Sequence, residues 1–241
     1  NMKNYINSKF KIFLNQKKDQ YSILNNNLKK YLKKRNLSGK LIVPRSSDYR
    51  KFKYKIENSY LSSEINKENM MFVFTLSNLL GINEKSLINS LKSFVGMPHR
   101  YEIFLRKKNC TFINDSKATS FQATKYALKN TKNIFWILGG LPKKNDRFNL
   151  GKLKKNIIKT YIIGKNIKFF TRQINNKIEY SITKTLKSSI IKILKDIKLI
   201  NKNNNTVLLS PASASFDQFK NFERRGDEFK KLCKYYARKY I

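Results

Sequence analysis

The sequence predicts an α/β protein whose C-terminal part is a mostly parallel sheet with helices on both faces. After residue 98, short apolar runs alternate with helical segments, which is typical of parallel sheets. Each run stops abruptly at small, hydroxylated or charged residues. The hydrophobic fraction of 40% is sufficient for a packed core.

The N-terminal part contains shorter elements and ends at a break in the pattern. We expect an amphipathic helix over Met2–Leu14 and leave Lys51–Tyr60 open. Gly96-Met97-Pro98 marks a boundary, which gives domains 1–97 and 98–241. The other expected N-terminal elements are strands over Tyr21–Leu24 and Lys40–Val43 and helices over Leu28–Lys34, Asn66–Leu80 and Glu84–Phe94.

The C-terminal part alternates regularly between strands and helices. The last helix has an apolar face formed by Phe222, Phe229, Leu232, Cys233 and Tyr236. The other expected elements are strands over Tyr101–Leu105, Thr111–Ile113, Ile134–Leu138, Tyr161–Ile163 and Val207–Leu209 and helices over Phe121–Leu128 and Thr183–Lys195.

The net charge of +37 is distributed over the whole chain rather than in one stripe. We interpret it as a solvated surface that attracts anionic ligands, and expect neither nucleic acid nor a membrane as partner. Cys110 and Cys233 are predicted to be reduced thiols of a cytoplasmic protein, and a single histidine, His99, excludes a zinc site made of histidines and cysteines. The longest apolar stretch, Met70–Ile82, is too short to span a bilayer.

Polar residues follow the predicted strands, and in a parallel sheet these positions meet along one edge. Asp115 could accept hydrogen bonds from sugar hydroxyls, and Arg100, Lys117 and Lys143 could pair with phosphate or carboxylate oxygens. Ser213 and Ser215 lie near a helix start, where hydroxyl and N–H groups bind anions. The alternative is that Asp115 caps a helix and that the basic residues are ordinary surface residues.

Three ordered segments resemble the Mur ligases, and within them the members that add D-glutamate. The segments are Gly96-Met97-Pro98-His99-Arg100-Tyr101-Glu102, Ile113-Asn114-Asp115-Ser116-Lys117-Ala118-Thr119, and Ser210 to Phe219 followed by Asn221-Phe222-Glu223-Arg224-Arg225-Gly226. The resemblance implies that residues 98–241 form a Rossmann-like C-terminal domain. Residues 1–97 would then be the C-terminal part of an α/β ATP-binding central domain.

The resemblance also implies a reaction and roles for individual residues. ATP, with Mg²⁺, would phosphorylate the L-alanine carboxylate of UDP-N-acetylmuramoyl-L-alanine, and the amine of D-glutamate would displace phosphate. Lys9, as a carbamate that binds Mg²⁺, and Lys117 would be catalytic. Nucleotide contacts would come from Asn66, His99, Arg100 and Asp115, and substrate contacts from Thr119, Lys143, Ser215, Phe216 and Phe222.

Two of the departures from this pattern bear most on the function. Leu141-Pro142 occupies a stretch in which the Mur ligases often have an acidic residue after Gly-Gly, and no Gly-x-x-x-x-Gly-Lys-Ser/Thr phosphate loop occurs. We therefore expect a monomeric fragment that is inactive alone. The alternatives are another Mur-type or a folylpolyglutamate-type ligase and, more distantly, a basic nucleic-acid-binding module.

Overall fold

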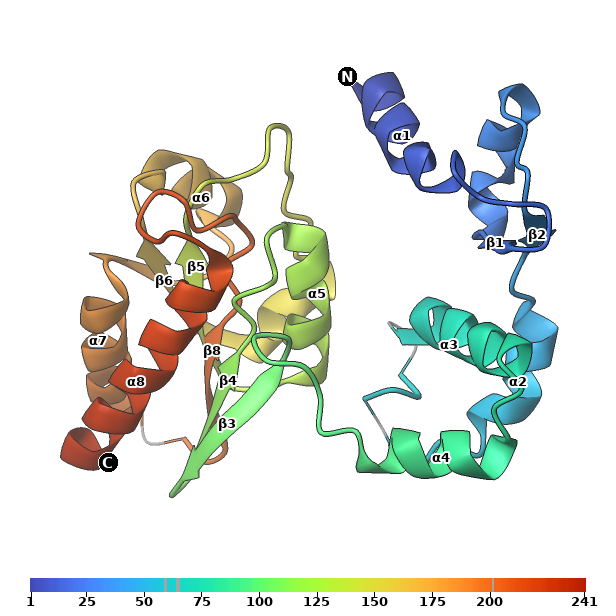
Figure 1. Cartoon of the computed structure of the whole chain (residues 1–241). Helices are drawn as coiled ribbons and strands as arrows, with labels where there is room; N and C mark the ends of the chain where they lie inside the picture. The colour runs from blue at the N-terminus through green and yellow to red at the C-terminus, as the bar shows by residue number, and fades with distance from the viewer. Residues whose placement is uncertain (59, 64–65, 201) are drawn as a thin grey trace. The chain divides into compact units, whose positions relative to one another are not determined.

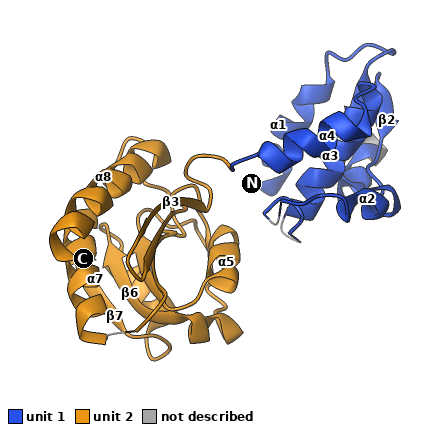
Figure 2. Cartoon of the chain, turned by 90° about the horizontal axis from the view of Figure 1, so that it is seen from below, with its two compact units in different colours: residues 1–95 blue, residues 96–241 orange. Residues whose placement is uncertain are grey.

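The chain forms two units that are joined after Val95 (Figures 1 and 2). The computed structural model describes residues 1–58, 60–63, 66–200 and 202–241. Unit 1 is Asn1–Val95 and unit 2 is Gly96–Ile241. In the described part of the chain, no helix combines the length and the apolar character that a membrane span requires.

Unit 1 contains a two-stranded parallel sheet and a small helical core. Strand β1 (Tyr21–Ile23) pairs with β2 (Lys40–Ile42), and a 3₁₀ helix (Asn26–Lys34) connects them, as predicted except for the tighter helix type. The N-terminal helix α1 (Met2–Phe10) continues as a 3₁₀ turn (Lys11–Phe13). The core joins apolar residues of α2 (Ser46–Lys53), α3 (Lys67–Leu79) and α4 (Glu84–Ser93).

Unit 2 is built on a six-stranded sheet with the strand order β3-β4-β8-β5-β6-β7. Only the hairpin pair β3–β4 at one edge is antiparallel; the other four pairings are parallel. The strands are β3 (Glu102–Lys107), β4 (Cys110–Asn114), β5 (Ile134–Gly139), β6 (Ile157–Ile163), β7 (Tyr180–Lys184) and β8 (Asn205–Leu209). The predicted, mostly parallel α/β fold is therefore confirmed.

Helices cover both faces of this sheet because side chains alternate along each strand. Phe112 of β4 points into one core with α7 (Leu186–Ile200) and α8 (Phe222–Tyr240), as Figure 1 shows for the helices. Its neighbour Ile113 points into the other core, which contains residues of α5 (Phe121–Asn130) and α6 (Ile167–Ile174). Every residue of the central strands β5 and β8 is buried.

Three elements of unit 2 were not predicted: strand β7, helix α6 and a 3₁₀ helix over Gly151–Asn156. Strand β7 lies at the edge of the sheet and is half-exposed, so it lacks the continuous apolar run by which the central strands were found. Helix α6 is only eight residues long. The helix predicted from Thr183 begins instead at Leu186, because Thr183 belongs to β7.

Gly139 ends β5 and Gly140 follows it, at positions where the backbone carbonyl groups of β6 and of the loop after β8 leave no room for a side chain. Gly139 has φ +137°, and a Cβ atom there would lie 2.1 Å from the carbonyl oxygen of Ile163. At Gly140, with φ +134°, a Cβ atom would lie 2.3 Å from the carbonyl oxygen of Ala214. The two glycines therefore allow the loops after three strands to approach one another.

We expect Gly139→Ala to lower the free energy of unfolding by about 3 kcal/mol or more, because both the left-handed backbone and the contact with Ile163 oppose a Cβ atom. Gly151→Ala is the matched control: φ is +43° and the nearest atom is 3.6 Å away, so only the backbone strain of about 1–2 kcal/mol applies. Urea unfolding followed by circular dichroism measures both. Equal losses in the two variants would contradict the steric explanation.

Candidate functional site

The carboxyl ends of four parallel strands lie at one edge of the sheet. Asn114 of β4 pairs with Leu209 of β8, and Leu209 also pairs with Ile137 of β5. Gly139 of β5 pairs with Ile163 of β6. This register brings the polar residues that follow the strands to the same edge, as the sequence predicted.

Backbone hydrogen bonds continue between the loops beyond the sheet. Asp115 N–H donates to the carbonyl of Leu209 at 2.8 Å. Leu141 and Ala214 exchange two backbone hydrogen bonds of 2.8 and 3.0 Å, although they follow different strands. The loops after β4, β5 and β8 are therefore fixed to one another.

Asp115 is a buried carboxyl group that is held by the chain itself. Ser210 Oγ donates to Oδ2 at 2.6 Å, and Tyr101 N–H donates to Oδ1 at 3.2 Å. Burial raises the pKa of Asp115 to about 7, although these hydrogen bonds and the charge of Arg100 act in the opposite direction. This carboxyl group therefore changes its charge near neutral pH.

Arg225 of α8 connects the loops after β4 and β8 from below the surface; it is 1% exposed. Its Nε donates to Ser116 Oγ at 3.0 Å, and its Nη2 donates to the carbonyl oxygens of Ser116 at 2.8 Å and Ser213 at 3.0 Å. Ser116 Oγ in turn donates to the carbonyl of Phe222 at 2.8 Å. Burial lowers the pKa of Arg225 to about 10, while the charge of Asp217 acts in the opposite direction, so the guanidinium stays charged at neutral pH.

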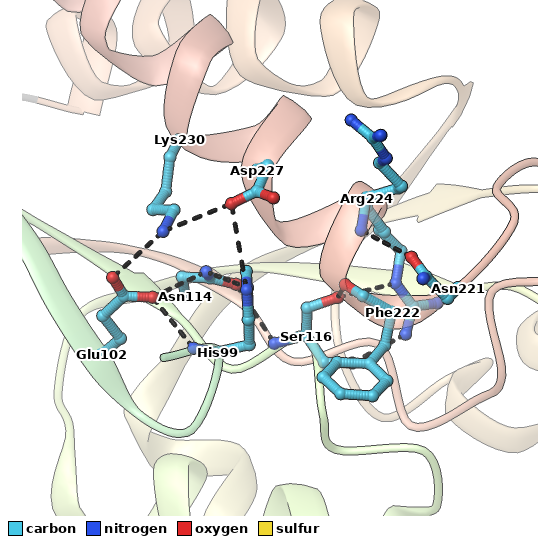
Figure 3. Close-up of polar contacts among 10 residues, drawn as sticks. His99, Glu102, Asn114, Ser116, Asn221, Phe222, Arg224, Asp227 and Lys230 are labelled. Carbon is cyan, nitrogen blue, oxygen red and sulfur yellow. Dashed lines mark hydrogen bonds and ion pairs between the residues drawn. The ribbon is translucent and has the colours of Figure 1, made fainter. Parts of the chain in front are cut away.

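His99 lies in a polar network between the start of β3 and α8 (Figure 3). Its N–H donates to Glu102 Oε2 at 2.9 Å, and its Nδ1 lies 3.0 Å from Asn114 Nδ2. Its Nε2 faces Asp227 Oδ1 at 3.8 Å. Lys230, one turn further along α8, forms ion pairs with Glu102 at 3.2 Å and with Asp227 at 3.4 Å.

The carboxylate of Glu102 is stabilised in its ionised form. Burial alone would raise its pKa, but the hydrogen bond from His99 N–H and the ammonium of Lys230 outweigh this and lower the pKa below its usual value. Asn114 Nδ2 adds a further hydrogen bond to Oε2 at 2.9 Å. Glu102 therefore acts as an acceptor for all three groups.

Lys117 and Thr119 follow Asp115 on the same loop. The Lys117 ammonium lies 3.7 Å from the ring centroid of Phe222, within the range of a cation–π contact. Lys117 N–H donates to the carbonyl of His99 at 3.0 Å. These contacts bring the predicted site residues His99, Lys117 and Phe222 together. Thr119, two residues after Lys117, is half-buried.

The remaining predicted residues of unit 2 differ in exposure. Ser215 is 2% exposed, whereas the next residue, Phe216, is 70% exposed. Lys143 and Arg100 are both exposed, and no side-chain contact anchors the Lys143 ammonium among the described residues. Phe216, Lys143 and Arg100 are thus available to a ligand without rearrangement of the core.

Lys9 and Asn66 belong to unit 1. The Lys9 ammonium is exposed in the last turn of α1 and lies 5.5 Å from the ring centroid of Tyr5. Asn66 is 9% exposed, and its Nδ2 donates to the carbonyl of Tyr60 at 2.8 Å. In the described residues, no group of three or more His, Cys, Asp or Glu side chains is found that could hold a metal ion.

Glu102, Asn114 and Arg225 were not predicted as site residues from the sequence, although all three lie within the segments that resemble the Mur ligases. Arg225 is one of 52 basic residues, and no local pattern distinguishes a buried arginine from a surface one. Asn114 ends an apolar strand directly before Asp115, which is the one signal that could have identified it.

Comparisons with known proteins agree with the fold and indicate a family. No protein-family model matches the chain. A UDP-N-acetylmuramoylalanine–D-glutamate ligase of Nitrobacter hamburgensis is 41% identical over 155 residues, covering 64% of this chain and 33% of the relative. The ligase of the same name from Wolbachia pipientis is 35% identical over 192 residues, covering 77% and 38%. The chain thus spans about a third of the length of these curated relatives.

A solved structure has a similar fold. The crystal structure of MurF from Acinetobacter baumannii matches with a TM-score of 0.52 and 14% identity, covering 71% of this chain and 38% of the other. At this identity, the likeness concerns the fold alone.

The raised pKa of Asp115 gives a pH-dependent expectation for stability. Between its unfolded pKa of 3.8 and its folded pKa of about 7, the folded state retains a proton that the unfolded state loses, so the stability falls as pH rises through this window. Asp115→Asn stays neutral. Its free energy of unfolding relative to the unmodified chain should therefore increase by up to about 3 kcal/mol between pH 5 and pH 8. Urea titrations at both pH values measure this difference, and a difference that does not change with pH would contradict the assigned ionisation.

Proposed function

We propose that this chain forms the amino-acid-binding part of a Mur ligase that adds D-glutamate. The premise is that the chain belongs to the Mur ligases and matches the C-terminal part of their D-glutamate-adding members. The observation that carries the proposal is the 41% identity to a relative named as a D-glutamate ligase. In addition, the polar residues that follow the strands lie at one edge of the sheet. The whole enzyme would act in peptidoglycan synthesis in the cytoplasm, as a monomer.

The proposed reaction forms an amide bond at the expense of ATP. The L-alanine carboxylate of UDP-N-acetylmuramoyl-L-alanine takes the γ-phosphoryl group and releases ADP. The amine of D-glutamate then attacks the acyl carbon, loses a proton, and displaces phosphate. Both steps bring anionic groups together, so the site has to reduce their mutual repulsion with positive charge.

The side chains of unit 2 suit anionic reactants. Lys117 is the candidate for contact with the reacting phosphoryl group, because its ammonium is oriented by the ring of Phe222. Lys143 and Arg100 are exposed cations that can pair with a carboxylate or a phosphate. Asp115 and His99 are the candidates for nucleotide contacts.

The substrate contacts proposed for D-glutamate come from the loops at the same edge. Thr119, Ser215, Phe216 and Phe222 are assigned to this role together with Lys143. The exposed ring of Phe216 is available to cover a bound ligand. The backbone pairing of Leu141 with Ala214 supports a common location, because it ties the Lys143 loop to the Ser215 loop.

Unit 1 is proposed to be the late part of the ATP-binding central domain, within domain limits of 1–97 and 98–241. The roles of Lys9, as a carbamate near Mg²⁺, and of Asn66, near the nucleotide, rest on sequence resemblance. No step of the proposed reaction is assigned to a metal held by this chain.

Two other functions compete with this proposal. Another Mur-type or folylpolyglutamate-type ligase would use the same scaffold for a different amino acid, but the relatives at 32–41% identity are all named as D-glutamate ligases. A nucleic-acid-binding module would explain the net charge of +37 but would leave the ordered strand-end motifs without a role.

A chimaera that joins the N-terminal two-thirds of the Nitrobacter hamburgensis ligase to this chain tests the proposal. We expect phosphate release with ATP, UDP-N-acetylmuramoyl-L-alanine and D-glutamate, and none with meso-diaminopimelate. The isolated chain should release no phosphate, because it has no phosphate loop. Turnover with meso-diaminopimelate instead of D-glutamate, or turnover by the isolated chain, would overturn the proposal.

In the same chimaera, Lys143→Ala should raise the KM for D-glutamate at least about tenfold, because one charge-assisted contact is lost. The KM for ATP should not change. Lys144→Ala is the matched control, because both lysines are exposed on the same loop. Equal effects of the two substitutions would remove Lys143 from the substrate site.

A further inference from the structure

We propose that Asn114 is a positioning residue that fixes the imidazole of His99 with Nδ1 as acceptor and Nε2 as donor, and that Glu102 in turn orients Asn114. The inference deepens the proposed function, since it concerns how a residue assigned to nucleotide contact is prepared for binding. It rests on contacts within unit 2 alone.

The partners of Asn114 determine which way its amide points. Its side chain belongs to a fully buried residue. Nδ2 lies 2.9 Å from Glu102 Oε2 and 3.0 Å from His99 Nδ1, while Oδ1 lies 3.2 Å from Ser116 N. An ionised carboxylate only accepts hydrogen bonds and a backbone N–H only donates, so Nδ2 has to face Glu102 and Oδ1 has to face Ser116.

The orientation of Asn114 fixes the tautomer of His99. One hydrogen of Nδ2 is directed to Glu102, and the other is directed to His99 Nδ1, which must therefore accept it. The proton of a neutral ring then lies on Nε2. The lowered pKa of Glu102 supports this assignment of donors and acceptors, because an ionised Glu102 can only accept the hydrogen bond from Asn114 Nδ2.

The packing around His99 keeps the ring in this position. The backbone of His99 is left-handed, with φ +62°, and its N–H is bound by Glu102. The ring packs edge-to-face with Phe222 at 5.9 Å. On α8, Gly226 leaves space for the ring, since a Cβ atom there would lie 2.2 Å from Nδ1.

Among the described residues, no hydrogen-bond acceptor is found for the Nε2 proton, and the His99 side chain is 7% exposed. The nearest carboxylate oxygen, that of Asp227, is 3.8 Å away, which is too long for a hydrogen bond. Asp227 is half-exposed and is also paired with Lys230, so it does not hold Nε2. On the proposed function, the Nε2–H is therefore the group of His99 that would donate to an acceptor atom of the nucleotide, such as a phosphate oxygen or a ring nitrogen.

The chain has a single histidine, so its tautomer can be read directly. Long-range ¹H–¹⁵N NMR spectra of the ¹⁵N-histidine-labelled chain, recorded at pH 8, contain the signals of His99 alone. We expect the Nε2–H tautomer in the unmodified chain. In Asn114→Asp, an oxygen acceptor replaces the Nδ2 donor at the same size, and the proton should move to Nδ1.

Two further variants make the test specific. Asn221→Asp is the matched control: it introduces the same charge at the start of α8 and can keep the capping bond to Arg224 N–H (2.8 Å), so the Nε2–H tautomer should remain. The double variant Glu102→Gln with Asn114→Asp keeps one carboxylate and one amide in the network. It should switch to Nδ1–H even if Asn114→Asp alone does not fold.

The Nδ1–H tautomer in the unmodified chain would overturn the inference, as would Nε2–H in a folded variant that carries Asp at position 114. The tautomer of the unmodified chain is measured without any substitution, so this outcome decides the inference even if neither position-114 variant folds. The result is independent of the proposed ligase activity, since an inactive chimaera leaves the tautomer of this chain unchanged.

Discussion

The candidate site depends on the buried guanidinium of Arg225. Parallel strands bring the loops after β4 and β8 to one edge, but the backbone pairing between these two strands ends at Asp115 N–H, which binds the carbonyl of Leu209. Beyond that point, Arg225 binds the carbonyl oxygens of Ser116 and Ser213 through one nitrogen atom. A planar guanidinium can serve several acceptors with fixed geometry, which an ammonium cannot. The hydrogen bonds to the two loops therefore offset the free-energy cost of burying the guanidinium charge, and they also fix how the loops are arranged.

Acidic side chains organise the interior of a strongly basic protein. The chain has 15 acidic and 52 basic residues. Glu102 joins the β3–β4 hairpin to α8 through Lys230. Asp196 of α7 accepts a hydrogen bond from Tyr161 Oη at 2.7 Å and pairs with Lys159 at 3.2 Å. Most basic residues remain on the surface, where their field attracts the anionic reactants of the proposed reaction.

The sequence predicted the elements that have strong local signals. The buried strands β5 and β8 were found because they are continuous apolar runs ended by Gly139 and Ser210. The half-exposed edge strand β7 and the short helix α6 lack such a signal. Of the residues at the candidate site, those with distinctive sequence neighbours, among them Asp115 and Lys117, were proposed from the sequence, while Arg225 and Glu102 were not. Their importance arises from partners more than 100 residues away in the sequence, Ser116 and Lys230 respectively.

Hydrogen exchange in the Arg225→Lys variant tests most directly whether Arg225 holds the loops after β4 and β8 together. A lysine keeps the charge but cannot bind both loops in the same geometry. We expect faster exchange, measured by mass spectrometry, in both residues 115–119 and residues 211–217, with β5 retaining the protection of the unmodified chain. Unchanged exchange in both loops, or a change in only one of them, would contradict the account.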